Sequence, residues 1–259
     1  NQQMHLSYGD RGVMSLNGKI DRMDLCEEDD KVYLKIIDYK SGRTKFDLAS
    51  VFHGLQLQLM VYMNAAREEQ QQKKKQCIVI PAGILYYHID DPVLESDTPL
   101  SDEEAEQALL FALRPDGLVN SGEEIYRAMD QNFEGKSQMI PVEIKKNGEI
   151  STARSKVAST EEFAVITRYV EHEIRQCGEA IYAGNIAVNP YRSDIETSCT
   201  YCPYGSVCGM DAKIPGYEYR QFASMKKEEV LDQMQTELAR NRGKEERSDE
   251  MDEGTAERH

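Results

Sequence analysis

The chain has 259 residues, and its 46 acidic side chains against 31 basic ones give a formal net charge of -15. This length fits one large domain, or a domain with appendages, and the charge excess argues against a free-standing protein that binds nucleic acid tightly. No apolar run approaches the roughly 20 residues of a membrane-spanning helix, and no charged-then-apolar leader opens the chain, so neither a membrane span nor secretion is expected.

The first third of the chain shows the period of strands, then that of a helix, then an apolar strand. Alternating apolar and polar residues on either side of the acidic turn 27–30 predict a hairpin. Apolar residues at helical spacing predict a single helix, followed by a solvated Gln/Lys run. The last apolar run is typical of a central strand buried on both faces. The predicted elements are strands at 13–25 and 32–40, a helix at 48–66, a loop at 70–75 and a strand at 77–89.

The rest of the chain is predicted to be mostly helical, with one cysteine-bearing loop. Ser101 with Glu104, and Ser159 with Glu162, have the spacing of capping boxes that begin helices. Beyond the loop charged residues dominate, which predicts a helix that frays into a disordered tail. The predicted elements are helices at 101–113 and 159–182, an irregular stretch at 114–135, a hairpin at 139–150 turning at Asn147-Gly148, a cysteine loop at 189–210 and the charged tail at 223–259.

Two carboxylates and a lysine form the sharpest chemical pattern. Asp38 and Lys40 lie two apart on one predicted strand, so both side chains point to one face, and Asp21 on the partner strand can join them. Converging carboxylates suit a hard cation such as Mg²⁺, which could polarise a phosphodiester while the lysine holds or deprotonates the nucleophile. Taken alone, Asp-x-Lys is more typical of a surface salt bridge.

A Gln–Tyr pair adds to this pattern. Gln58 and Tyr62 are four residues apart on the predicted helix, so they lie on one face beside the apolar stripe. From there their polar groups can reach over the strand ends towards a phosphate. The alternative is that Tyr62 is a core residue with a solvated hydroxyl and that Gln58 flanks it.

Three ordered motifs carry a resemblance to a known family. They are Gly18-Lys19-Ile20-Asp21-Arg22-Met23-Asp24, Ile37-Asp38-Tyr39-Lys40-Ser41-Gly42 and Gln58-Leu59-Met60-Val61-Tyr62. Their wording and spacing resemble the RecB-like PD-(D/E)XK nucleases, and most of all the C-terminal nuclease domains of the AddB subunits of bacterial AddAB helicase–nucleases. The resemblance covers roughly residues 10–222. It implies an α/β fold with a restriction-endonuclease-like core, in which helices flank a mixed central sheet and a cysteine loop follows.

The resemblance also implies a metal-dependent active site. Two carboxylates and a backbone carbonyl would bind Mg²⁺ or Mn²⁺, a lysine would assist the attacking water, and the Gln-x-x-x-Tyr element would position DNA or that lysine. The expected metal ligands are Asp21, Asp38 and the carbonyl of Tyr39. The expected catalytic residues are Asp21, Asp38, Lys40, Gln58 and Tyr62.

One part of the family pattern is expected to be missing. Members of the family carry a Glu or His on a helix before the first strand, whereas only residues 1–12 precede the first predicted strand here. His5 lies in an extended-looking stretch and is not assigned this role. We therefore expect a piece of a longer protein with incomplete metal affinity, and an inactive fragment is one expected outcome.

Three cysteines near the C-terminal end form a Cys-x₂-Cys-x₅-Cys pattern. Cys199, Cys202 and Cys208 are more typical of metal ligands than of disulfides in a chain without a secretory signal. Zinc and iron–sulfur sites both need four ligands, so zinc completed by a distant histidine and three unconnected thiols stay open as alternatives. The resemblance implies a 4Fe–4S cluster whose fourth cysteine lies upstream, so this chain is not expected to hold an intact cluster. The remaining cysteines, Cys26, Cys77 and Cys177, are expected to be small buried hydrophobic residues.

The resemblance predicts a nuclease domain at 1–222, including the cysteine loop, and a charged appendage at 223–259. Its expected function is Mg-dependent hydrolysis of DNA, as the exonuclease domain of a cytoplasmic bacterial helicase–nuclease complex that processes double-strand breaks for recombination. The expected partners are a DNA strand delivered by a helicase, an AddA-like subunit and the upstream remainder of the chain. Two alternatives stay open: a stand-alone iron–sulfur exonuclease of the CRISPR-associated type, and a non-catalytic module that binds DNA ends.

Overall fold

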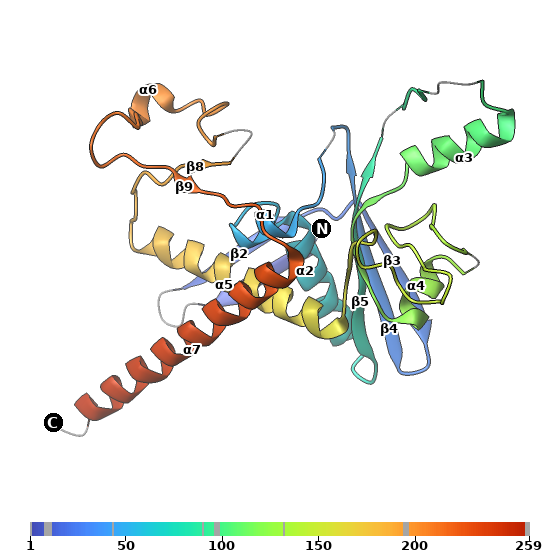
Figure 1. The fold of residues 1–259 in the computed structure, drawn as a ribbon. Helices are drawn as coiled ribbons and strands as arrows, with labels where there is room; N and C mark the ends of the chain where they lie inside the picture. The colour runs from blue at the N-terminus through green and yellow to red at the C-terminus, as the bar shows by residue number, and fades with distance from the viewer. Residues whose placement is uncertain are drawn as a thin grey trace. The chain divides into compact units, whose positions relative to one another are not determined.

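The computed structural model describes residues 2–7, 12–42, 44–89, 91–95, 99–131, 133–193 and 197–256. The chain divides into two compact units, which we describe separately (Figure 1). Unit 1 comprises residues 1–47 and 56–171, and unit 2 comprises residues 48–55 and 172–259. Among the described helices, none combines the length and the apolar character needed to cross a membrane.

A five-stranded mixed sheet lies at the centre of unit 1, with the strand order β3-β4-β5-β6-β7. β3 and β4 are antiparallel, β4 and β5 parallel, β5 and β6 antiparallel, and β6 and β7 parallel, while β1 and β2 form a separate antiparallel pair. The strands are β1 Gln2–Ser7, β2 Val13–Gly18, β3 Arg22–Glu28, β4 Lys31–Lys40, β5 Ile78–His88, β6 Asp116–Asn120 and β7 Val157–Ala158. The predicted mixed α/β architecture is therefore confirmed.

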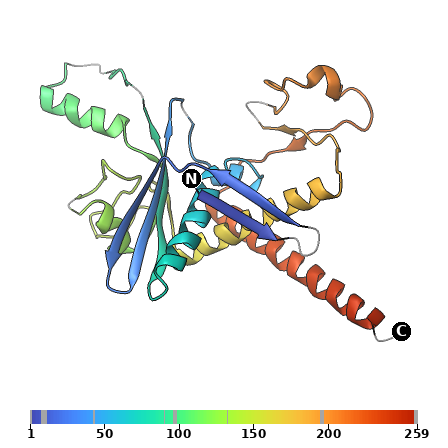
Figure 2. The same cartoon turned by 180° about the vertical axis from the view of Figure 1, so that it is seen from behind.

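Helices cover this sheet and connect its strands. α2 packs against β4 and β5 and lies on the crossover between these two parallel strands (Figure 2). Both predicted capping boxes form: the backbone N–H of Ser101 donates to Glu104, that of Ser159 donates to Glu162, and each serine hydroxyl accepts in return. The helices that begin or lie in unit 1 are α2 Gln58–Lys73, α3 Asp102–Ala112, α4 Glu123–Met129 and α5 Thr160–Tyr182, the last of which continues into unit 2.

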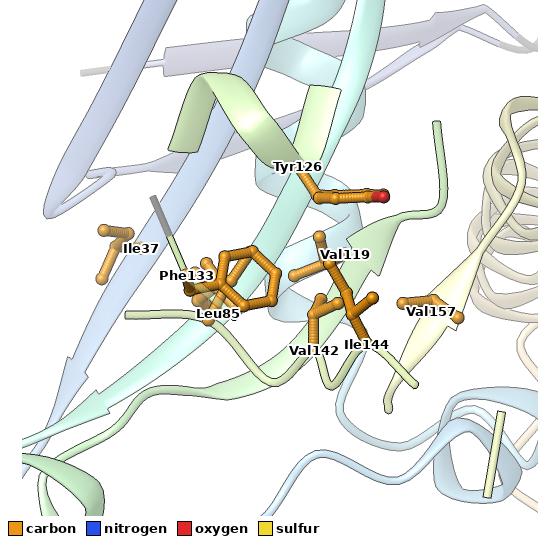
Figure 3. Close-up of a cluster of buried hydrophobic side chains, with 9 residues drawn as sticks. Ile37, Leu85, Val119, Tyr126, Phe133, Val142, Ile144 and Val157 are labelled. Carbon is orange, nitrogen blue, oxygen red and sulfur yellow. The ribbon is translucent and has the colours of Figure 1, made fainter. Parts of the chain in front are cut away.

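Apolar side chains from both faces of β4 and β5 fill the core of unit 1. One cluster joins the sheet to α4 and to the segment between α4 and β7 (Figure 3). Each large aliphatic side chain buried in this way contributes about 1.5–3 kcal/mol relative to an exposed one, so the two strands are rigid supports for whatever stands at their ends. The cluster consists of Ile37, Leu85, Val119, Tyr126, Phe133, Ile140, Val142, Ile144 and Val157.

A one-residue bulge sets the register between β4 and β5. Leu34 pairs with Pro81, but the next residue of β4, Lys35, pairs with Gly83, so β5 contains one extra residue at this point. Proline has no N–H to give to a ladder, which is why strands tolerate it best at such irregularities. Beyond the bulge Asp38 pairs with Tyr86, and a slip of one residue would turn every following side chain to the other face.

Unit 2 contains short helices, one long helix and a two-stranded parallel ribbon. α1 packs against α7, and the rings of Tyr191, Phe222 and His53 stack in a row with centroid separations of 4.6 and 4.0 Å. The elements are α1 Leu48–Phe52, β8 Tyr191–Arg192, α6 Gly205–Cys208, β9 Arg220–Gln221 and α7 Lys227–Ala256.

The prediction of one strand over 13–25 is wrong. The chain leaves the β1–β2 pair after Gly18 and enters the five-stranded sheet at Arg22, so residues 13–25 belong to two sheets. The alternation of apolar and polar residues continues through the corner, which is why the sequence reads as one strand. The corner places Asp21 just before β3, where its carboxylate accepts the backbone N–H of Tyr39 at 3.0 Å.

The prediction of one helix over 48–66 is also wrong. The helical pattern is interrupted after α1, where Gly54 and Gln56 have left-handed φ values of 79° and 48°. The Gln56 side chain stabilises the break, because it donates to the carbonyl of Lys45 at 3.0 Å and accepts from the N–H of Asp47 at 3.1 Å. α2 therefore starts at Gln58, and it continues to Lys73, past the predicted start of the loop at residue 70.

Short elements between residues 114 and 158 were not predicted. β6 and α4 lie in the stretch expected to be irregular, and the two-residue strand β7 follows it. In the predicted hairpin at 139–150 the turn at Asn147-Gly148 forms, with Gly148 at φ 85°, but only the isolated bridge between Ile144 and Ile150 joins its two sides. Elements of this length bury too few residues to leave a recognisable period in the sequence.

Candidate active site

The last residues of β4 extend beyond the pairing with β3, which begins at Arg22 opposite Ile37. Asp38 and Lys40 therefore stand at the end of a central strand, on the same face, as their spacing predicted. Asp38 is only 3% exposed, while the side chain of Lys40 is partly exposed. Lys40 Nζ lies 2.6 Å from Asp38 Oδ2. A buried carboxylate is thus paired with an ammonium that can still reach solvent.

A chain of hydrogen bonds continues from Lys40 to α2. Lys40 Nζ donates to Gln58 Oε1 at 2.9 Å, and Gln58 Nε2 donates to the hydroxyl oxygen of Tyr62 at 3.1 Å. Gln58 is the first residue of α2, so the break after α1 is what places it at the strand end. The structure therefore brings Gln58 and Tyr62 to the Asp-x-Lys strand end, in agreement with their expected i, i+4 arrangement.

Gly18, at the end of β2, is in close contact with Tyr62. A Cβ atom at this position would lie 2.7 Å from Tyr62 Cε1, well inside van der Waals distance. Only glycine lets the β2 backbone approach the ring so closely. The contact fixes one side of the Tyr62 ring and, through Gln58, the position of the Lys40 ammonium.

Asp21 joins the site through the backbone. Its Oδ2 accepts the N–H of Tyr39, the residue between Asp38 and Lys40. In an antiparallel pair the N–H and C=O of one residue point to the same edge, so the Tyr39 carbonyl also faces the Asp21 side of β4. The predicted ligand atoms, two carboxylates and one carbonyl, thus come from adjacent backbone positions on two strands.

The residues present fit a hard divalent cation. Among the described residues none donates a hydrogen bond to Asp38 Oδ2, although this atom is buried, and its contact with Lys40 is an ion pair without hydrogen-bond geometry. Buried polar atoms are nearly always satisfied, so such an oxygen needs a partner that the chain itself does not supply. Carboxylate and carbonyl oxygens are the ligands that Mg²⁺ prefers.

Tyr86 lies beside the ion pair and was not singled out from the sequence. It pairs in register with Asp38, and its ring centroid lies 5.3 Å from Lys40 Nζ. Burial, and to a smaller extent the negative charge of Asp38, raises the pKa of Tyr86 to about 12. The tyrosine therefore stays neutral at any pH at which a nuclease works.

The three cysteines of the predicted cluster site share a region without forming a site. Cys199 and Cys208 are half-exposed, Cys202 is exposed, and all three are free thiols. In the part of the chain that the structure describes, no three His, Cys, Asp or Glu side chains are arranged to hold a metal ion. The hydrogen bond between Tyr219 and the Cys199 thiol raises the pKa of Tyr219.

The expectation of burial for the other cysteines is wrong for two of them. Cys26 and Cys177 are exposed, and Cys77 is half-exposed. Cys26 lies on β3, the edge strand of the sheet, and Cys177 lies in the C-terminal half of α5, where most residues are exposed. Neither position offers the enclosed surroundings that a small hydrophobic side chain usually occupies.

Three residues that organise the site were missed as such from the sequence. Gln56 was read as a helical residue, Gly18 only as part of a motif, and Tyr86 only as part of a buried strand. The Gly54-x-Gln56 break could have been suspected from the glycine. The contacts of Gly18 and Tyr86 depend on strand register, which the sequence does not reveal.

Comparison with known proteins agrees with the geometry. Residues 2–209 match the PD-(D/E)XK nuclease superfamily. Proteins named as subunits of an ATP-dependent helicase/deoxyribonuclease are similar to this chain: that of Thermoanaerobacter sp. (strain X514) is 39% identical over 233 residues, and those of Lachnoclostridium phytofermentans and Clostridium botulinum (strain Hall) are 40% identical over 237 and 235 residues. These alignments cover 90%, 88% and 91% of this chain but only 20% of each relative, so the chain spans about a fifth of their length. Since the superfamily match extends over most of its residues, the chain belongs to the PD-(D/E)XK nuclease superfamily.

Proposed function

We propose that this chain is a metal-dependent deoxyribonuclease domain that hydrolyses DNA phosphodiester bonds with Mg²⁺ or Mn²⁺. The observation that carries the proposal is the end of β4, where the buried oxygen of Asp38, the ammonium of Lys40 and the amide of Gln58 converge. A salt bridge on the protein surface, the alternative for an isolated Asp-x-Lys, would not bury its carboxylate in this way.

Each residue of the site has a distinct proposed role. Asp21, Asp38 and the carbonyl of Tyr39 would hold the cation, which when bound would polarise the phosphodiester and lower the pKa of a bound water. Lys40 would orient the attacking water and stabilise the negative charge that develops on the phosphate. Its other contacts hold the ammonium at the strand end, so it needs no rearrangement before reaction.

Gln58 and Tyr62 would serve the lysine and the DNA strand together. Gln58 is exposed, and one end of its amide holds Lys40 while the other donates to Tyr62. The partly exposed Tyr62 hydroxyl keeps its own proton free for a phosphate oxygen. The pair therefore couples substrate contact to the position of the lysine.

The domain would act as part of a larger helicase–nuclease. The relatives are named as ATP-dependent helicase/deoxyribonuclease subunits, and this chain corresponds to only a fifth of them. A net charge of -15 is poorly suited to capture DNA without help. We propose that the rest of such a protein and an AddA-like partner deliver a single strand to this exonuclease domain, in the repair of double-strand breaks in the bacterial cytoplasm.

The cysteines and the C-terminal helix fit the same proposal. Cys199, Cys202 and Cys208 would hold a 4Fe–4S cluster only together with a fourth cysteine from elsewhere in the longer protein, because three thiols leave the cluster one ligand short. Within this chain residues 1–222 would form the nuclease domain, and the segment 223–259, which includes α7, would be a dispensable appendage.

Cleavage of labelled single-stranded DNA tests the function. The chain, and a longer chain with its upstream segment, would be incubated with Mg²⁺ or Mn²⁺ beside Asp38→Ala and Lys40→Ala variants. Metal-dependent cleavage that both substitutions abolish is the expected result. Equal cleavage by the variants, or none by the longer wild-type chain, would contradict the proposal and favour a non-catalytic module that binds DNA ends.

A further inference from the structure

The Lys40 ammonium has three neighbours, and only two of them belong to the recognised motifs. Asp38 and Gln58 contact it through oxygen atoms at 2.6 and 2.9 Å. The third neighbour is the ring of Tyr86, whose centroid lies 5.3 Å from Nζ, within the range of a cation–π interaction. Tyr86 is 2% exposed, whereas Gln58 is exposed, so the ring forms the buried side of this arrangement.

The position of the ring is fixed by the sheet. Tyr86 pairs with Asp38 of β4 on one side and with Asp116 of β6 on the other, so its backbone is held by two ladders. Paired residues of parallel strands project to the same face, and Lys40 is two residues beyond Asp38, so all three side chains share that face. The bulge at Pro81 is what puts Tyr86, rather than its neighbour Leu85, beside the ion pair.

We propose that Tyr86 is a positioning residue of the active site, whose ring face holds the Lys40 ammonium against Asp38. This inference rests on the proposed function, since it concerns the proposed catalytic lysine. The lysine stem has four flexible carbon atoms, and one face of the ammonium has neither an acceptor nor a charge to hold it. A neutral ring face attracts the cation on that side without offering an oxygen that would draw it away from the carboxylate. The raised pKa of Tyr86 keeps the phenol uncharged, so the support does not vary with pH in the working range.

Two variants separate the ring face from the hydroxyl. Tyr86→Leu removes the π face, whereas Tyr86→Phe keeps it. Tyr33→Leu is the matched control, because Tyr33 is also on the sheet and 3% exposed but packs in a different cluster, with Ala82 and Ile125. Thermal melting of each variant would correct the measured rates for the fraction of folded protein.

The first readout is cleavage of single-stranded DNA by the longer chain. We expect Tyr86→Leu to lower kcat roughly tenfold and to change KM less than twofold, whereas Tyr86→Phe and Tyr33→Leu stay within about twofold of wild type. A merely structural role would lower the folded fraction of Tyr86→Leu and of the Tyr33→Leu control alike, without a specific loss of kcat.

The second readout needs neither metal nor activity. Acetic anhydride would acylate the lysines of the metal-free chain, and mass spectrometry would compare the rate at Lys40 with that at the exposed Lys145. We expect Lys40 to react about threefold faster in Tyr86→Leu than in wild type or Tyr86→Phe, because the ammonium loses its buried contact.

The two readouts distinguish the possible failures. If Tyr86→Leu matches wild type in both kcat and Lys40 acylation, the inference is overturned, while an inactive Asp38→Ala variant leaves the proposed function intact. If the wild-type chain cleaves no DNA but Lys40 acylation still rises in Tyr86→Leu, the positioning contact stands and the proposed function falls.

Discussion

The end of β4 and the cysteine region carry the two sets of chemically active residues in this chain, and the polypeptide holds only the first set together. Asp38, Lys40, Gln58 and Tyr62 form an unbroken series of contacts between 2.6 and 3.1 Å. The three thiols near the C-terminal end have no comparable arrangement in the part that the structure describes.

The difference follows from what surrounds each set. The first stands on a central strand whose apolar residues are buried in unit 1 and at the start of a helix packed on that strand. The second lies among short elements with exposed residues, and α6 has only four residues and buries none. A site of the first kind is preorganised, whereas thiols of the second kind need the binding energy of a metal or cluster to assemble them. Substitutions should therefore affect chemistry at β4 and have little effect on the isolated chain at the cysteines.

The largest effect is expected from Asp38→Ala, which removes the buried ligand oxygen. We expect the rate of DNA cleavage to fall about 10³-fold, because a bound cation contributes several kcal/mol to transition-state stabilisation. Initial rates on labelled single strands measure this, and the rise in melting temperature on adding Mg²⁺ should disappear as well. Asp24→Ala is the control, since Asp24 lies on β3 and pairs with Arg22 and Lys35 instead. A loss of similar size in the control would argue against a specific site at β4.

A smaller effect is expected from the hydrogen bonds that hold Lys40. Gln58→Ala should lower kcat roughly tenfold, since it removes a hydrogen bond to a charged group. Tyr62→Phe should cost about threefold, and the double variant should be no slower than Gln58→Ala, because the tyrosine acts on the lysine through the glutamine. Gln72→Ala, on the same helix, should behave as wild type. Strictly additive losses in the double variant would show that the two residues act independently.

Gly18→Ala should act first on stability and only then on rate. The added methyl would lie 2.7 Å from Tyr62 Cε1, so we expect a loss of about 1–3 kcal/mol in the free energy of unfolding from overpacking. Urea unfolding measures it, and the loss should shrink when Tyr62 is also replaced by Ala. Gly205→Ala is the control, because a Cβ there meets nothing within 4 Å. An undiminished loss in the double variant would mean that the ring is not what Gly18 makes room for.

The sequence predicted those features that depend on local pattern. β4 and β5 were found because nearly every residue in them is apolar, and the starts of α3 and α5 because Ser and Glu at capping-box spacing satisfy free backbone groups. The corner at Asp21 and the break at Gln56 were not found. Both depend on side-chain hydrogen bonds to residues that only the fold brings near, Tyr39 in one case and Lys45 in the other.

The same limit applies to the candidate site. The spacing of Asp38 and Lys40, and of Gln58 and Tyr62, predicted which residues share a face. The pairing of Asp38 with Tyr86 could not be predicted, because a bulge at Pro81 shifts the register by one residue, and the alternation of an apolar strand is the same before and after the shift. Neighbours along the chain were thus predictable, and neighbours across the sheet were not.

The smallest effect is expected at the cysteines. Cys202→Ser, in the chain as it stands, should change the free energy of unfolding by less than about 0.5 kcal/mol, because the thiol is exposed and belongs to no assembled site in the described residues. The same substitution in a protein that holds a cluster would remove a ligand and with it much of the binding energy that orders the loop. Comparing the urea unfolding of wild type and variant therefore shows in which of these two states the region is.

Iron and sulfide analysis of the chain purified without oxygen completes this test. We expect iron far below the amount of a 4Fe–4S cluster, because Cys199, Cys202 and Cys208 supply three of the four ligands and no described side chains gather to complete the set. Iron close to stoichiometric would mean that another group of the chain serves as fourth ligand. The cysteine region would then be as fully built by the chain as the end of β4, and Cys202→Ser would have to destabilise it by several kcal/mol.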